Sequence, residues 1–195
     1  MRNNMPRRIP RPQQLALLLP NMERGGIVVT RALRSHRSCG RVVERVRYVL
    51  RYFPEIGGVP IRVGLTHAAS GMAVPGGNEI WLNPGRTSYH TIAHEFVHLL
   101  QRGGGVPRGE RSCDVHSLAR HWTLNDEAPS YVNIPPRLLQ IDGKLTPTAA
   151  RIVYEVACEA LDRRQTGTRR YIAWFEERLA SVDYASLTLP TSRVS

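Results

Sequence analysis

The sequence is poor in lysine and in long hydrophobic runs. Lys144 is the only lysine among 27 basic residues, so the net charge of +11 and the pI near 10.5 come almost entirely from arginine. The apolar run near the start, Leu15 to Leu19, is shorter than the roughly 7–15 residues of a signal-peptide core and the ~20 residues of a membrane span. We therefore expect no transmembrane segment and a cytoplasmic protein.

Cysteine is also scarce, which excludes two classes of small protein. Cys39, Cys113 and Cys158 are far apart and form no Cys-x-x-Cys pair, so the sequence encodes neither a disulfide framework nor a zinc ribbon. This usage fits a reducing compartment. With 195 residues, of which 42% are hydrophobic, the chain is long enough to form the core of one ordinary domain.

The excess of arginine makes an acidic partner plausible. Nucleic acid, an anionic membrane surface or an acidic substrate would each be attracted, although net charge alone does not name the partner. Residues 1–25 hold four prolines and clustered arginines with little periodicity, which predicts a flexible basic arm. We expect residues 26–195 to form a single domain.

The spacing of apolar residues predicts an α+β fold. Apolar residues recur at helical spacing from Ser38 to Phe53, and alternate from Pro60 to Thr66 as in a strand. A second strand at about 71–74 and a third at 79–82 flank the turn residues 75–78, which predicts a hairpin. The predicted order is a helix, a small sheet and then further helices.

Capping signals divide the rest of the chain into helices. Thr87 or Ser88 can cap a helix that runs to about Arg102, where three glycines end it. Pro107 suits the first turn of a helix lasting to about Trp122. Two closing helices are predicted, from Thr146-Pro147 to Arg164 and from a Thr168 cap to Ser181.

The residues His94-Glu95-Phe96-Val97-His98 carry the clearest chemical signal. Positions i and i+4 of a helix lie about 40° apart, so His94 and His98 can both reach one metal ion. Glu95 lies beside them and can act as general base and acid in the attack of a zinc-bound water. The neighbouring residues are largely apolar, and unpaired histidines would be costly to bury there. The motif predicts a catalytic Zn²⁺ site.

A catalytic zinc needs a third protein ligand, which the helix after the glycine turn can supply. That helix should fold back antiparallel to the motif helix. Glu110 and Asp114 are again i and i+4, so Glu110 can bind the metal while Asp114 orients a histidine. Two alternatives remain open: Asp114 is itself the ligand, or His116 is, with the helix docked differently.

His-Glu-x-x-His followed by Glu-x-x-x-Asp resembles the gluzincin branch of the zincin metallopeptidases, over roughly residues 38–122. The resemblance implies a zincin-like fold, a zinc ion held by His94, His98 and Glu110, and Asp114 bonded to a ligand histidine. Zincins often present a tyrosine or histidine to the developing oxyanion, and Tyr131, on the loop after the ligand helix, is the candidate here. The alternative, which we favour, is that Tyr131 only anchors this loop. In zincins the strand before the motif helix is an edge strand that pairs with substrate, which corresponds here to Glu79, Ile80, Trp81, Leu82 and Asn83.

Other branches fit less well. The metzincin pattern would place glycine and histidine where this chain has Gln101 and Gly104. SprT-like proteases, which act on proteins crosslinked to DNA, resemble this basic chain, but they often carry a zinc ribbon. The leading expectation is a zinc metallopeptidase acting on protein or peptide. The alternative is a basic protein associated with nucleic acid, either a SprT-like protease or a non-catalytic polyanion-binding protein with structural zinc.

Overall fold

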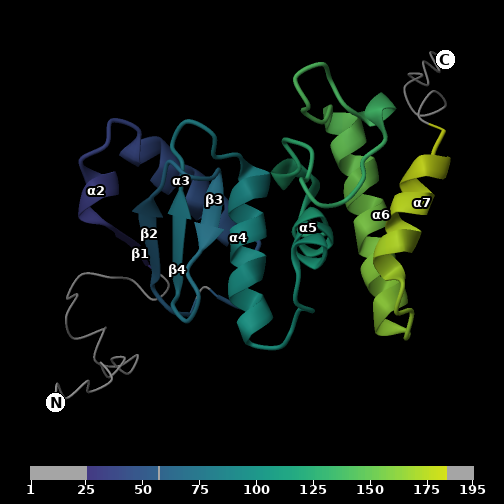
Figure 1. The fold of residues 1–195 in the computed structure, drawn as a ribbon, viewed down its shortest axis with the longest axis horizontal. Coiled ribbons are helices and arrows are strands. Elements are labelled where there is room, and N and C mark those ends of the chain that lie inside the picture. Colours follow the sequence, from purple (N-terminus) through teal and green to yellow (C-terminus); the bar gives the residue numbers. More distant parts are fainter. Residues whose placement is uncertain (1–25, 57, 184–195) are drawn as a thin grey trace, which may run out of the picture.

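The protein has an α+β architecture, as predicted. The computed structural model describes residues 26–56 and 58–183. Within these ranges it contains a four-stranded mixed sheet and six α-helices, with the sheet at one end and the last two helices at the other (Figure 1). The predicted basic arm, residues 1–25, lies outside the described residues.

The sheet is built from four short strands in the order β1-β2-β4-β3. They are β1 (Ile27–Val29), β2 (Ile61–Leu65), β3 (Gly71–Ala73) and β4 (Glu79–Leu82). β1 and β4 both pair with β2 in parallel, whereas β3 and β4 are antiparallel. The predicted β3–β4 hairpin is therefore confirmed, whereas the three-residue strand β1 was not predicted.

The predicted edge position of Glu79–Asn83 is wrong. β4 lies inside the sheet, because Ile80 pairs with Val63 of β2 on one side and with Ala73 of β3 on the other. The hairpin places β3 outside β4, so β3 forms the edge at this end of the sheet. Asn83 follows β4, and its N–H donates to the carbonyl of Ser70, just before β3.

The six helices are shown in Figure 1. They are α2 (Arg31–Arg34), α3 (Cys39–Leu50), α4 (Tyr89–Arg102), α5 (Glu110–Leu118), α6 (Pro147–Gln165) and α7 (Tyr171–Ser181). Short 3-10 turns, η1 (Trp122–Leu124) and η2 (Pro136–Leu138), lie between α5 and α6. α4 begins where predicted, since Ser88 Oγ accepts from the Thr91 N–H at 2.8 Å, which satisfies one of its free amides.

Two predicted helix starts are wrong. α5 begins at Glu110 and not at Pro107, because Gly109 before it has φ of 107°, a left-handed conformation that suits glycine and ends any helical path from Pro107. α5 also ends at Leu118 and does not continue to Trp122. α7 begins at Tyr171, and the residue at its N-cap position is Arg170 in place of the predicted Thr168.

The buried apolar side chains form two clusters. The first joins the sheet to α3 and α4, with the rings of Phe53 and Phe96 edge to face at 5.3 Å. The second joins α5, α6 and α7 and includes Val115 and Leu118. α4 and α5 meet at the boundary between the clusters. Among the described residues, no helix combines the length and apolar character needed to cross a bilayer.

Candidate metal centre

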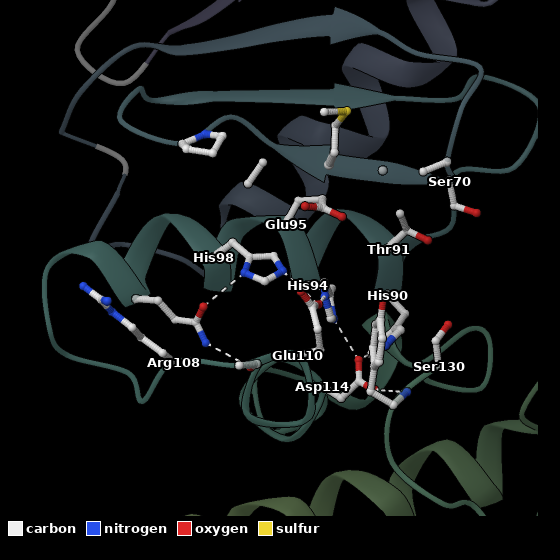
Figure 2. A pocket seen from close by; sticks show the side chains of 18 of the residues that line it. Ser70, His90, Thr91, His94, Glu95, His98, Arg108, Glu110, Asp114 and Ser130 are labelled. Carbon is white, nitrogen blue, oxygen red and sulfur yellow. Dashed lines mark hydrogen bonds and ion pairs between the residues drawn. The ribbon is translucent and has the colours of Figure 1, made fainter.

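The two motif histidines and Glu110 meet where α5 crosses α4 (Figure 2). Glu110 Oε2 lies 3.0 Å from His94 Nε2 and 3.1 Å from His98 Nε2. His98 meets the start of α5, whereas His90 lies near Ser117 at its end. The two helices therefore run in opposite senses, although α5 is seen nearly end-on in Figure 1 and crosses α4 steeply. The structure brings the three predicted ligands together.

The carboxylate of Asp114 fixes the proton of His94. Asp114 Oδ1 lies 2.8 Å from His94 Nδ1, and a carboxylate can only accept, so Nδ1 carries the proton and donates it. Nε2 of His94 is then unprotonated in the neutral ring and faces Glu110. The predicted role of Asp114, to orient a histidine, matches this geometry, which is common at zinc sites.

Gln101 does the same for His98. The amide Nε2 of Gln101 donates to the carbonyls of Pro107 at 2.6 Å and Gly109 at 3.1 Å. This leaves Gln101 Oε1 facing His98 Nδ1 at 3.0 Å, and because Oε1 can only accept, Nδ1 must donate. Nε2 of His98 is therefore also unprotonated in the neutral ring. The loop between α4 and α5 thus determines the tautomer of a motif histidine.

Three electron-pair donors converge on one point and need a cation between them. Two bare imidazole nitrogens facing one carboxylate oxygen repel each other unless a proton or a metal ion lies among them. Ligand atoms of a tetrahedral zinc site with bonds of about 2.0–2.1 Å lie roughly 3.3 Å apart. The separations of 3.0 and 3.1 Å from Glu110 are close to that value, so the donor set fits zinc.

Two other trios, which do not include Glu110, have all their donor atoms within 4.8 Å of one another. They are His94, His98, Cys113 and His90, His94, Asp114. We favour Glu110 because, among the described residues, it contacts Nε2 of both motif histidines. Cys113 Sγ instead lies 3.2 Å from His98 Nδ1, the nitrogen already used by Gln101. Burial raises the pKa of the Cys113 thiol, which disfavours the thiolate that binds metals.

Asp114 is almost wholly buried and bonded on both oxygens. Burial alone would raise its pKa, but the hydrogen bond from His94 and the approach of His90 Nε2 to 3.5 Å hold the pKa of Asp114 well below its ordinary value. For His94, burial lowers the pKa, but the hydrogen bond to Asp114 and nearby carboxylates outweigh it and raise the pKa. Both shifts show that the pair interacts strongly. Asp114 therefore serves as a charged partner of histidine and not as a free ligand.

Tyr131 lies at the rim of the site, half exposed. Its N–H donates to Asp114 Oδ2 at 2.7 Å, and its ring stacks on that of His94 with centroids 5.8 Å apart. Burial and the carboxylates nearby raise the pKa of the Tyr131 phenol, so it stays protonated and able to donate. The structure thus places Tyr131 beside the predicted ligands.

His116, the other alternative ligand, lies away from this site. Its Nδ1 donates to the carbonyl of Ser112 at 2.8 Å, and its side chain lines a separate cavity with Arg120 and Arg164. Burial lowers the pKa of His116 to about 4, with the two arginines adding to the effect. The docking of α5 therefore excludes His116 from the group formed by His94, His98 and Glu110.

Glu95 is buried next to the histidines. Burial raises its pKa above the ordinary value, although His94 and His98 oppose this shift. The Ala73 N–H of β3 bonds to the carboxylate, which links the edge strand to the motif helix. The chain approaches closely here: a Cβ on Gly71 would lie 2.9 Å from Glu95 Oε1 and 2.9 Å from Thr91 Cγ2, so only glycine fits.

A cleft of about 850 Å³ opens over this group of residues. Its walls are β3 and the turn after it on one side, and the first turns of α5 and the Tyr131 loop on the other. Glu95, His94, His98 and Glu110 line its floor (Figure 2). The cleft therefore combines a buried carboxylate, a candidate cation site and a strand edge.

The three residues that the sequence indicated as candidate ligands lie together beside Glu95, whereas the contact of Gln101 with His98 was not predicted. The signal was present, because Gln101 lies three residues after His98 and so on the same side of α4. Comparisons with known proteins assign nothing further: no family model, curated protein or solved structure matches the chain. The chemistry below is inferred from the residues and their geometry.

Proposed function

We propose that the protein is a zinc-dependent hydrolase of the zincin type that cleaves peptide bonds. The observation that carries the proposal is the contact of Glu110 Oε2 with His94 Nε2 at 3.0 Å and with His98 Nε2 at 3.1 Å, with the histidine protons held on the opposite nitrogens. This arrangement is prepared for a cation before one binds. It supports the gluzincin-like interpretation of the sequence.

His94, His98 and Glu110 would hold the zinc ion, and Asp114 and Gln101 would keep the two rings oriented. Zinc bound there supplies a Lewis acid that polarises a carbonyl group and acidifies water. The protein atoms contribute the fixed geometry. Because both ring protons are anchored by hydrogen bonds, neither imidazole has to rotate or change tautomer when the ion enters.

Glu95 is the proposed general base and acid. Its raised pKa brings the carboxylate closer to the pKa range in which a group both takes up and releases a proton near neutrality. Glu95 can accept the proton of the attacking water and later deliver it to the leaving amine nitrogen. The Ala73 N–H keeps the carboxylate aimed into the cleft while it does so.

The free edge of β3 supports a peptide as substrate. The Val74 N–H bonds to the carbonyl of Glu79 in β4, so in this antiparallel ladder the backbone groups of the alternate residues Gly71 and Ala73 point outward, toward the cleft. The Ala73 N–H bonds to Glu95, so the groups offered to a substrate strand are the N–H and carbonyl of Gly71 and the carbonyl of Ala73. An extended peptide can add there as a further strand. The protonated phenol of Tyr131 lies across the cleft, where it can donate to a carbonyl oxygen that gains negative charge.

The test compares metal content and hydrolysis in Glu95→Gln, Glu110→Ala and wild-type protein. Glu95→Gln should keep zinc and lose about a hundred-fold to ten-thousand-fold in hydrolysis of an unstructured protein or a peptide library, the typical contribution of general acid–base catalysis. Glu110→Ala should lose both hydrolysis and bound zinc. Metal content is measured on dialysed protein by atomic spectroscopy.

Glu177→Gln is the matched control, since Glu177 is exposed on α7, far from the cleft. Full hydrolysis by Glu95→Gln at unchanged zinc content would disprove the assigned base. Unchanged zinc content in Glu110→Ala would disprove the assigned third ligand. The two outcomes are independent of each other.

A further inference from the structure

The positive charge of the described chain is concentrated in one segment. Residues 31–51 contain seven arginines and a single acidic residue, Glu44. The remaining described residues carry 14 basic and 14 acidic side chains, so their charges cancel. The arginines of this segment, called the arginine face below, are Arg31, Arg34, Arg37, Arg41, Arg45, Arg47 and Arg51. They belong to α2, α3 and the adjoining turns (Figure 1).

The arginine face is turned to solvent. On α3 the apolar stripe of Val42, Val46 and Val49 is buried in the first hydrophobic cluster. At 100° per residue Arg41 and Arg47 fall on the other half of the helix, whereas Arg45 lies at the border of the apolar stripe. All of the arginine face except the half-buried Arg45 is exposed. None of it lines the metal cleft.

No carboxylate among the described residues neutralises the arginine face. The ion pairs of the described chain use arginines elsewhere, such as Arg111 with Glu176 and Arg120 with Glu55. Members of the arginine face bond to backbone carbonyls: Arg34 to Val29 at 3.2 Å and Arg41 to Pro84 at 2.9 Å. A carbonyl orients a guanidinium without cancelling its charge, so the field of this face remains directed outward.

A row of aromatic rings supports two of these arginines. Tyr89, Tyr48, Tyr52 and His121 follow one another with centroids 5.0, 5.7 and 4.7 Å apart. Arg51 lies over the ring of Tyr48 at 4.3 Å, and Arg45 lies over that of Tyr89 at 5.5 Å. Rings that hold guanidinium groups in place reduce the entropy lost when those groups bind a ligand.

We propose that the arginine face binds the phosphate backbone of nucleic acid. Arginine recognises phosphate with paired N–H donors. α3 has 12 residues and is therefore about 18 Å long, and a duplex presents one charge per ~1.7 Å of its axis, or about ten charges over that length. Arginines that have no carboxylate partner among the described residues would thus face regularly spaced phosphates.

An anionic membrane fits less well. Surface helices that bind membranes insert an apolar face between the lipids, but the apolar face of α3 is already buried against the sheet. The exposed large hydrophobic side chains of the described residues are Val59, Met72, Tyr131 and Ile141, and none belongs to residues 31–51. Nucleic acid needs no such insertion, so it is the partner that the surface favours.

The test measures binding of the full chain to labelled oligonucleotides by fluorescence anisotropy. A strand and a duplex of about 20 nucleotides are titrated between about 50 and 200 mM salt. The wild type is compared with the triple variant Arg37→Gln, Arg47→Gln, Arg51→Gln. The matched control is Arg169→Gln, Arg170→Gln, Arg178→Gln, which removes the same charge from exposed positions around α7, at the far end of the molecule in Figure 1.

The wild type should bind with a steep salt dependence. In the arginine-face variant the slope of log affinity against log salt should shrink by about 2.7, or about 0.9 for each lost phosphate contact, which weakens binding up to about 500-fold at 0.1 M salt. The control should keep the wild-type slope. Thermal unfolding confirms that both variants fold, and if the triple variant does not, Arg37→Gln and Arg47→Gln alone should each reduce the slope by about 0.9.

Three results would overturn the proposal. They are equal slope changes in both triple variants, an unchanged slope in the arginine-face variant, and binding to phosphatidylserine vesicles without binding to either oligonucleotide. The binding test does not depend on the proposed hydrolase activity, because the arginine face and the cleft share no residue.

Discussion

Replacing Asp114 with asparagine tests how the metal centre is prepared. Asp114 Oδ1 accepts from His94 Nδ1 at 2.8 Å, and Oδ2 accepts from the Tyr131 N–H at 2.7 Å. Asparagine offers one acceptor oxygen and one NH₂ group, so one of the two partners loses its acceptor. If the NH₂ group faces His94, the ring must move its proton to Nε2, the atom that would bind the metal.

The size of the effect follows from these two bonds. Loss of a partner that orients a metal-binding histidine lowers metal affinity about 10–100-fold. The metal-free variant should lose about 1.5–3 kcal/mol in its free energy of unfolding, since a buried hydrogen bond to a charged group is broken. Zinc affinity is measured by competition with a chelator, and stability by urea unfolding.

Asp142→Asn is the control for Asp114→Asn, because Asp142 is exposed and pairs only with the neighbouring Lys144. It should leave zinc affinity unchanged. If Asp114→Asn binds zinc as tightly as the wild type, the carboxylate does not set the histidine tautomer, and the account of the prepared site given above is wrong.

Asp114 also predicts how stability depends on pH. Its pKa in the folded protein is lower than in the unfolded chain, because the hydrogen bond from His94 and the nearby His90 ring outweigh burial. The stabilisation is therefore present above the ordinary pKa of ~3.9 and is lost as the pH falls toward the folded-state pKa. Urea unfolding of metal-free protein between about pH 3 and 7 should show a steeper loss toward acid in the wild type than in Asp114→Asn.

Two further substitutions address the neighbours of the site. Gly71→Ala places a Cβ 2.9 Å from Glu95 Oε1, so hydrolysis should fall at least about tenfold at unchanged zinc content; Gly40→Ala, whose Cβ meets nothing within 4 Å, is the control, and equal activity of the two would refute the steric argument. Gln101→Leu removes the acceptor of His98 Nδ1, so zinc affinity should fall about tenfold. Gln101→Glu keeps an acceptor and should retain more of the affinity, and an equal loss in both would contradict the proposed role.

Local signals predicted the bounds of the motif helix well. Ser88 caps α4, and the helix ends at Arg102 as the glycine run indicates. The i, i+4 spacing of His94 and His98 fixes their common face whatever the rest of the fold does. Glu110 required only that the next helix return to the motif helix, which the short connection made nearly obligatory.

Features that depend on distant pairing were not accessible in the same way. The interior position of β4 follows from which strands flank it, and nothing within Glu79–Leu82 distinguishes an edge strand from its neighbour. The start of α5 depends on the φ of Gly109, which its sequence neighbours leave open. The role of Gln101 depends on where the carbonyls of Pro107 and Gly109 lie, and thus on the path of the whole loop.

The candidate metal centre lies at the boundary between the two hydrophobic clusters, so a bound ion would also affect stability. His94 and His98 belong to α4, whose apolar face is part of the first cluster, and Glu110 begins α5, whose Val115 and Leu118 belong to the second. An ion shared by these ligands would crosslink the two halves of the protein. Bound at a thousandfold excess over its Kd, it would add about 4 kcal/mol to the stability of the folded chain. The concentration of the metal ion would then set the stability of the contact between the two clusters, as well as the catalytic activity of the cleft.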